Sequence, residues 1–162
     1  MIFVTTGTNE QGFDRLVRAA RELPGDEELV VQYGSSTEAH GRGTWEAFMP
    51  WEDMMRHMTQ ARVVVAHAGV GSILLAHRCG KRPVVLPRLV SLGEAVDDHQ
   101  VELGRRLDAR GQVTFVEDQA ALHRAVLSGA DGVLARAADG APVNGPLVAS
   151  LRATLERLMA AA

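Results

Sequence analysis

A short stretch in the first half of the chain combines residue types that bind phosphate. Residues 67–72 read His-Ala-Gly-Val-Gly-Ser, follow an apolar run at 63–66 and lead into a helix-like segment at 73–79. A strand that passes through glycines into a helix presents free backbone amides and the positive end of the helix dipole. His67 and Ser72 add side chains that can donate hydrogen bonds to phosphate oxygens. The pattern favours a phosphate-binding turn that includes Gly69, Val70 and Gly71, and the alternative is a tight turn that binds nothing.

Two further segments carry polar or glycine-rich residues after an apolar run. Residues 5–8 read Thr-Thr-Gly-Thr, where Gly7 permits a close backbone approach and Thr8 offers a hydroxyl to a diphosphate or its sugar. The segment 88–100 is long and polar for a connection inside a compact domain, which is typical of functional loops. A plain turn remains the alternative for residues 5–8.

The second half of this loop offers hydrogen-bonding side chains at the start of a predicted helix. Asp97 and Asp98 are suited to capping that helix, and His99 and Gln100 then fall in its first turn, where they can reach sugar hydroxyls. Adjacent residues of a helix point in different directions, so we expect no metal site there. Arg88 either neutralises a phosphate or is a solvated loop arginine.

The elements that position these loops follow from the apolar pattern. Short β-branched runs at 2–5, 29–33, 63–66, 84–86 and 113–116 are typical of buried parallel strands, and 45–50 predicts a short sixth strand. Helical periodicity separates them, with Val96, Leu103 and Leu107 predicted to share one face. The alternation predicts an α/β fold, a single Rossmann-like doubly wound parallel sheet of five to six strands, with all three loops on one edge.

The length and composition of the chain exclude several classes of protein and of partner. At 162 residues, we expect one domain over 1–162, with a turn-rich connector at 139–146 before a C-terminal helix. The net charge of -3 and the lack of a dense basic block argue against nucleic acid as a partner. No apolar run approaches the ~20 residues of a membrane span, and no secretory signal opens the chain, so we expect a cytoplasmic protein. Cys79 is expected to be buried, and the apolar cluster of Phe48, Trp51, Met54 and Met55 is interpreted as core rather than partner surface.

In these segments the chain resembles the C-terminal, donor-binding half of a GT-B glycosyltransferase. It is most similar to small stand-alone subunits that pair with a membrane-bound acceptor-binding subunit, in dolichol-diphosphate-GlcNAc N-acetylglucosaminyltransferases and bacterial exopolysaccharide glycosyltransferases. The resemblance rests on seven segments in order, at residues 2–8, 13–16, 67–73, 80–83, 87–88, 93–94 and 97–102.

The resemblance implies a UDP-sugar donor whose diphosphate lies at Gly7, Thr8 and residues 67–72. Asp98, His99 and Gln100 would then bind the donor sugar, and Arg88 and Glu94 would make a phosphate or loop contact. The chain departs from its relatives at Leu75, where many have a glutamate that holds the ribose, and at Ala95, where close relatives carry a histidine. Ribose recognition is therefore unassigned, and the nucleotide is less firmly predicted than the diphosphate.

The predicted function is that of the donor-binding subunit of a two-component hexosyltransferase, inactive without a membrane-associated partner that recruits it to the inner face of the membrane. The partner would supply a lipid-linked or polysaccharide acceptor and the general base, so we assign no catalytic residue in this chain. No Asp-x-Asp motif is present, and we expect no metal or other cofactor. One alternative is a non-catalytic nucleotide-sugar-binding regulatory module, and another is a self-sufficient hydrolase or epimerase acting on nucleotide sugars.

Overall fold

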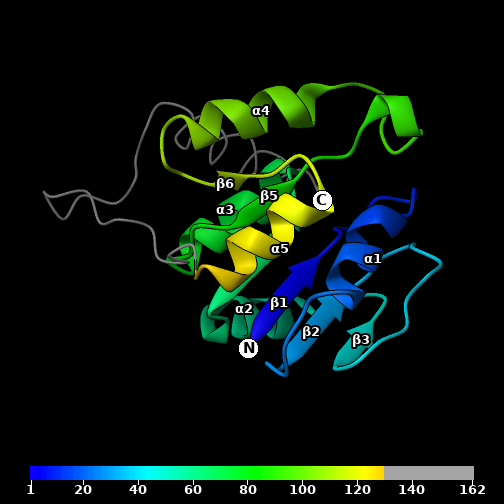
Figure 1. Cartoon of the computed structure of the whole chain (residues 1–162), viewed down its shortest axis with the longest axis vertical. Helices are drawn as coiled ribbons and strands as arrows, with labels where there is room; N and C mark the ends of the chain where they lie inside the picture. Colours follow the sequence, from blue (N-terminus) through cyan, green and yellow to red (C-terminus); the bar gives the residue numbers. More distant parts are fainter. Residues whose placement is uncertain (130–162) are drawn as a thin grey trace, which may run out of the picture.

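The chain folds into one parallel β-sheet with helices on both faces (Figure 1). The computed structural model describes residues 1–129, in which the strands follow the order β3-β2-β1-β4-β5-β6 and every neighbouring pair is parallel. The strands are β1 (Ile2–Thr5), β2 (Leu29–Gln32), β3 (Thr44–Glu46), β4 (Val63–His67), β5 (Val84–Leu86) and β6 (Thr114–Phe115). The helices are α1 (Asp14–Arg21), α2 (Trp51–Gln60), α3 (Val70–Arg78), α4 (His99–Asp108) and α5 (Gln119–Leu127), with a 3-10 turn η1 (Val90–Leu92).

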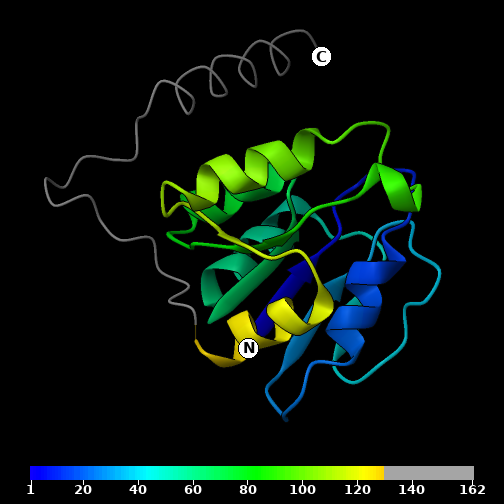
Figure 2. The ribbon, with the colours of Figure 1, turned by 45° about the horizontal axis from the view of Figure 1, so that its top comes forward.

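Alternate residues of the strands feed two separate layers of core, because successive side chains of a strand point to opposite faces. Ile2 and Val4 pack with α1 and α5, whereas Phe3 packs with Met58 of α2 and with α3. Leu107 of α4 covers β5 on the same side as α2 and α3. Figures 1 and 2 show α1 and α5 together on the opposite side. The predicted doubly wound α/β fold is therefore confirmed.

The order of the strands reverses between β1 and β4, which lie side by side at the centre of the sheet. From β1 the chain continues to β2 on one side, and from β4 it continues to β5 on the other. In such sheets ligands bind beyond the carboxyl ends of the strands at this reversal. The loops after β1, β4 and β5 are the three segments singled out in the sequence, and the parallel arrangement places them on one edge, as predicted.

Several helices and strands begin or end at other residues than the sequence predicted. The helix expected at 73–79 begins at Val70, so the glycine-rich turn is itself the first turn of α3. The short sixth strand is present as β3 but ends at Glu46, and β6 is confined to Thr114–Phe115.

The predicted helical face of Val96, Leu103 and Leu107 is wrong for Val96. This side chain is 91% exposed and precedes α4, which begins at His99. The Asp97 carboxylate accepts a hydrogen bond from the His99 amide at 3.1 Å and so ends the loop immediately before the helix. Of the two aspartates expected to cap this helix, Asp97 therefore bonds its first amide.

The interpretation of the apolar cluster at 48–55 as core is wrong for its two aromatic residues. Phe48 is 56% exposed and Trp51 is 62% exposed, whereas Met54 and Met55 pack against the core layer under α2 and α3. Pro50 is the N-cap of α2, and the two rings on either side of it line a pocket instead of filling the core.

Two expectations concern segments outside the described residues, namely the connector at 139–146 and the C-terminal helix. Among the helices of residues 1–129, none is both long and apolar enough to cross a bilayer.

Cys79, which was expected to be buried, is half-buried, with its Sγ 3.8 Å from the Met55 sulfur.

Gly104 tests the packing of α4 on the sheet, because a Cβ there would overlap the Phe115 ring of β6. Alanine normally stabilises a helix interior relative to glycine, yet we expect Gly104→Ala to destabilise the fold by about 1–3 kcal/mol through overpacking. Gly71→Ala is the matched control, since its Cβ would meet no atom within 4 Å, and it should be neutral or stabilising. Urea denaturation measures both variants, and equal effects would contradict this account of α4.

Candidate functional site

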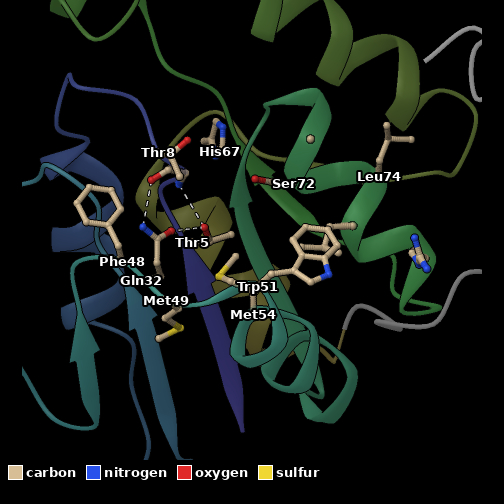
Figure 3. A pocket seen from close by; sticks show the side chains of 14 residues that line it. Thr5, Thr8, Gln32, Phe48, Met49, Trp51, Met54, His67, Ser72 and Leu74 are labelled. Carbon is tan, nitrogen blue, oxygen red and sulfur yellow. Dashed lines mark hydrogen bonds between the residues drawn. The ribbon is translucent and has the colours of Figure 1, made fainter. Parts of the chain in front are cut away.

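A pocket with a cavity volume of about 690 Å³ opens at the point where the strand order reverses (Figure 3). Its walls come from the carboxyl ends of β1, β2 and β4, the segment before α2, and one side of α2 and α3. Figure 3 shows Thr5, Thr8 and Gln32 at the strand ends with Phe48 and Met49 beside them, and Trp51 and Met54 on the side of α2. The lining residues are Thr5, Gly7, Thr8, Gln32, Phe48, Met49, Trp51, Met54, His67, Gly71, Ser72, Leu74, Leu75 and Arg78.

The His67 ring lies between two glycines that the sequence placed in different loops. A Cβ on Gly7 would overlap the ring on one side, and a Cβ on Gly69 would overlap it on another. Gly7 also has a φ of +79°, which L side chains rarely adopt. The ring therefore fixes the separation of the β1 and β4 loops, and neither glycine can be replaced without moving it.

The environment of His67 keeps its imidazole neutral. Burial and, to a smaller extent, the positive charge of Arg88 lower its pKa to about 4, and the Thr5 carbonyl opposes this only partly. The buried Nδ1 makes no hydrogen bond of good geometry within residues 1–129. At neutral pH the ring can therefore donate one hydrogen bond to a ligand oxygen but brings no positive charge.

A buried hydrogen-bond network holds the β1 loop in place. The Thr5 hydroxyl donates to Gln32 Oε1 at 2.5 Å and accepts from the Gly7 amide at 3.2 Å. Gln32 Nε2 donates to the carbonyls of Gly7 and Ala47 at 3.1 and 2.7 Å. Gln32 thus ties together the segments that follow β1 and β3, and all its amide hydrogens and its oxygen have partners.

The first turn of α3 supplies free backbone donors. The Ile73 amide is the first to bond within the helix, to the Gly69 carbonyl at 3.1 Å, which leaves the amides of the three preceding residues without a helical acceptor. No side chain caps this end, and no acidic residue lies in its first turn. Since Gly71 and Ser72 line the pocket, an anion there would meet both free amides and the helix dipole.

Arg88 and Glu94 lie within the loop framework and not among the residues lining the pocket. The Arg88 side chain is buried, donates to the carbonyls of Gly12, Glu94 and Thr6, and stacks on the Phe13 ring. Glu94 accepts a bidentate pair of hydrogen bonds from Arg15, with closest contacts of 3.0 and 2.8 Å. Of the two contacts predicted for Arg88 and Glu94, the structure describes the loop contact, which joins the β5 loop to the β1 loop.

The three residues predicted to bind the donor sugar lie at the start of α4, outside the lining of the pocket. His99 is exposed and pairs with Asp97 at 3.0 Å, Asp98 occupies the cap position, and Gln100 Oε1 accepts from the Arg88 amide at 3.1 Å. The Gln100 contact places this helix end on the same sheet edge as the pocket. Sugar binding by these residues stays a prediction.

Sequence reasoning found the polar half of the pocket but missed most of its apolar half. It singled out Gly7, Thr8 and residues 67–72, of which five line the pocket, and it did not assign Gln32. A polar residue that ends the otherwise apolar run 29–32 was a usable signal. The remaining histidines behave as packing or surface groups, because His57 stacks on Phe3, His77 and His123 bond backbone carbonyls, and His40 is exposed.

No cluster of three or more His, Cys, Asp or Glu side chains suited to a metal occurs in the part of the chain that the structure describes. The expectation that no metal is required stays a prediction.

Comparisons with known proteins agree with this geometry. A family model described as the glycosyltransferase family 28 C-terminal domain matches residues 1–139. The UDP-N-acetylglucosamine transferase subunit ALG13 of Yarrowia lipolytica is 34% identical over 90 residues, which are 51% of this chain and 44% of that protein. The chain thus spans less than half the length of this relative.

Two solved structures share the fold. The calicheamicin glycosyltransferase CalG4 matches with a TM-score of 0.61 and 16% identity over 97% of this chain and 43% of that one. The glycosyltransferase of kitacinnamycin matches with a TM-score of 0.55 and 20% identity over 99% of this chain and 39% of that one. These neighbours confirm the expected architecture, one half of a GT-B glycosyltransferase.

The burial of His67 predicts a specific loss of stability in mild acid. The folded protein holds its pKa near 4, below the value near 6.5 of an unfolded chain, so the unfolded state binds the proton first as pH falls. The contribution is fully present above pH 6.5, and between pH 7 and pH 5 about 2 kcal/mol of unfolding free energy should be lost.

His67→Asn provides the comparison, because it removes this titration and leaves that of His77, whose pKa is also lowered by burial. Urea unfolding at both pH values should show a smaller loss for the variant, by about 2 kcal/mol. Glu27, with a pKa lowered to about 2 chiefly by hydrogen bonding to Arg62, contributes to acid sensitivity only below this range. Equal losses in the two proteins would show that His67 is not buried as described.

Proposed function

Since the chain belongs to glycosyltransferase family 28, through its C-terminal domain, we propose that it binds the nucleotide-sugar donor for a glycosyltransferase. The proposed donor is a UDP-sugar that carries a hexose or N-acetylhexosamine. The observation that carries this proposal is the uncapped first turn of α3, which opens into the pocket beside Gly7 and His67. The ALG13 relative, named as a UDP-N-acetylglucosamine transferase subunit, supports the choice of nucleotide.

The first turn of α3 would hold the donor diphosphate. Its free amides and the helix dipole stabilise negative charge, which increases on the diphosphate as the bond to the sugar breaks. Arg78, the one charged side chain among the described residues that line the pocket, is at the C-terminal end of α3, away from this turn. Beside the free amides, Ser72 and neutral His67 add hydrogen-bond donors. These groups would stabilise the leaving group without a metal ion.

The apolar half of the pocket would hold the nucleoside. Phe48 and Trp51 line the pocket and are more than half exposed, and a nucleobase can stack on such aromatic surfaces. The donor sugar would then extend from the other end of the diphosphate toward Asp98, His99 and Gln100, on the same sheet edge.

A complete transferase needs an acceptor site and a general base, and we propose that a membrane-associated partner supplies both. The pocket contains no carboxylate among the described residues, and His67 is a poor base because its pKa is about 4. The partner would bring a lipid-linked or exopolysaccharide acceptor and recruit the chain to the cytoplasmic face of the membrane. The word subunit in the name of the ALG13 relative supports this arrangement.

Co-expression with a candidate acceptor-binding partner tests the transferase proposal. Radiolabelled sugar should pass from a UDP-sugar to the lipid-linked acceptor when both proteins are present, and not with either alone. Nucleotide-sugar binding without transfer by the reconstituted pair would favour the regulatory module instead, and activity of the chain alone would favour a self-sufficient enzyme.

Gly71→Ala tests the diphosphate position directly. The added methyl group meets no protein atom within 4 Å, but it lies where the backbone would approach the phosphates. Calorimetry with UDP should show at least a tenfold loss of affinity, about 1.4 kcal/mol, while thermal denaturation shows no loss of stability. Gln60→Ala, at the exposed end of α2, is the control and should bind UDP like the parent. Unchanged affinity in Gly71→Ala would place the phosphates elsewhere.

A further inference from the structure

Gln32 is a buried polar residue at the end of an otherwise apolar strand. In β2 it follows Leu29, Val30 and Val31. Since alternate residues of a strand share a face, Gln32 lies on the same side of the sheet as Val30, the side on which α2 and α3 pack and the pocket opens. An apolar side chain would fill this position without the cost of burying an amide. The packing of the sheet alone therefore does not explain a glutamine here.

The amide group of Gln32 completes a closed ring of hydrogen bonds with Thr5 and Gly7. The Thr5 hydroxyl donates to Gln32 Oε1 at 2.5 Å, the Gly7 amide donates to the Thr5 hydroxyl at 3.2 Å, and Gln32 Nε2 donates to the Gly7 carbonyl at 3.1 Å. Both polar backbone groups of Gly7 are thus held by side chains that also bond each other. Because Gly7 meets the His67 ring and lines the pocket, this ring of bonds fixes one wall of the pocket.

The same Nε2 atom also holds a different wall. It donates to the Ala47 carbonyl at 2.7 Å, and the Gly34 amide donates to that carbonyl at 2.8 Å. The Ala47 carbonyl and the Phe48 amide belong to one planar peptide group, so holding the carbonyl also orients the backbone of Phe48. Phe48 lines the pocket and is more than half exposed, so core packing contributes little to its position. Figure 3 shows Gln32 between Phe48 and Thr5.

From these contacts we propose that Gln32 is a positioning residue for nucleotide binding, which holds the pocket walls at Gly7 and Phe48 at a fixed separation. The inference rests on the proposed donor-binding function and names a residue that this function requires. Its physical basis is that a pocket whose walls are already held in place loses less conformational freedom when a ligand binds. Without Gln32, the Gly7 carbonyl has no other hydrogen-bond donor among the described residues, and both walls gain freedom.

Gln32→Met tests the proposal, because methionine has a similar length and lacks the amide group. Calorimetry with UDP should show a loss of affinity of about tenfold. Gly104→Ala is the control for lost stability, since its site between α4 and β6 lies outside the pocket lining, and it should bind UDP like the parent. An affinity of folded Gln32→Met within about threefold of the parent would overturn the inference and leave the donor-binding function standing. If the parent does not bind UDP, the proposed function fails, and this inference with it.

Gln32→Glu adds a readout that a merely structural role would not move, and it serves if Gln32→Met does not fold. When protonated, the introduced carboxyl keeps an acceptor for Thr5 and one O–H donor, whereas its ionised form has no donor for the two carbonyls. Burial raises the pKa of a carboxyl in such a position. The ratio of parent to variant UDP affinity should therefore rise by about fivefold or more from about pH 5.5 to about pH 8.5.

The other groups that titrate or carry charge near this position are the same in both proteins. They are Glu46, the register partner of Gln32 on β3, and His67 and Arg78 of the pocket lining. Their titration, like that of the UDP phosphates, cancels in the ratio of the two affinities. A ratio that does not change with pH would overturn the role assigned to the Gln32 amide.

Discussion

The contact of the His67 ring with Gly7 and Gly69 is the constraint on which the site depends. It joins the loops that follow β1 and β4, the two central strands between which the sheet order reverses. Because both loops meet the same ring, the free amides of α3 and the polar end of β1 face one pocket. Only glycine allows so close an approach on both sides, which explains why two glycines from segments 62 residues apart share one role.

Three surrounding polar side chains, those of Thr5, Gln32 and Arg88, hold this arrangement through hydrogen bonds within the protein. Gln32, which also bonds Thr5, holds the β1 loop through the Gly7 carbonyl. Arg88 holds the same loop through the carbonyls of Thr6 and Gly12. The buried charge of Arg88 also keeps His67 neutral. The pocket thus offers an anion hydrogen-bond donors that are already oriented, although the chain as a whole carries a net charge of -3.

Local sequence patterns predicted the strands, the helices and the glycine-rich turn that begins α3, because each depends on neighbouring residues. The predictions that failed depend on contacts between distant segments. Arg88 could equally have been a solvated residue, and its burial requires the Gly12 carbonyl, 76 residues away in sequence. Phe48 and Trp51 are exposed because they line a pocket formed by distant strands and helices, which apolar composition does not specify. Val96 was wrongly assigned to the helix because the helical spacing of apolar residues begins before α4 itself, which starts at His99.

The division of α3 into two functional turns has a consequence for specificity. Its first turn would bind the diphosphate through backbone amides, which every residue except proline provides, but only small residues there, such as Gly71, let the phosphates approach. Its second turn lines the pocket with the side chains of Leu74 and Leu75. A nucleoside held in the apolar part of the pocket would meet these side chains, so substitutions there would change nucleotide affinity and leave the phosphate-binding amides in place.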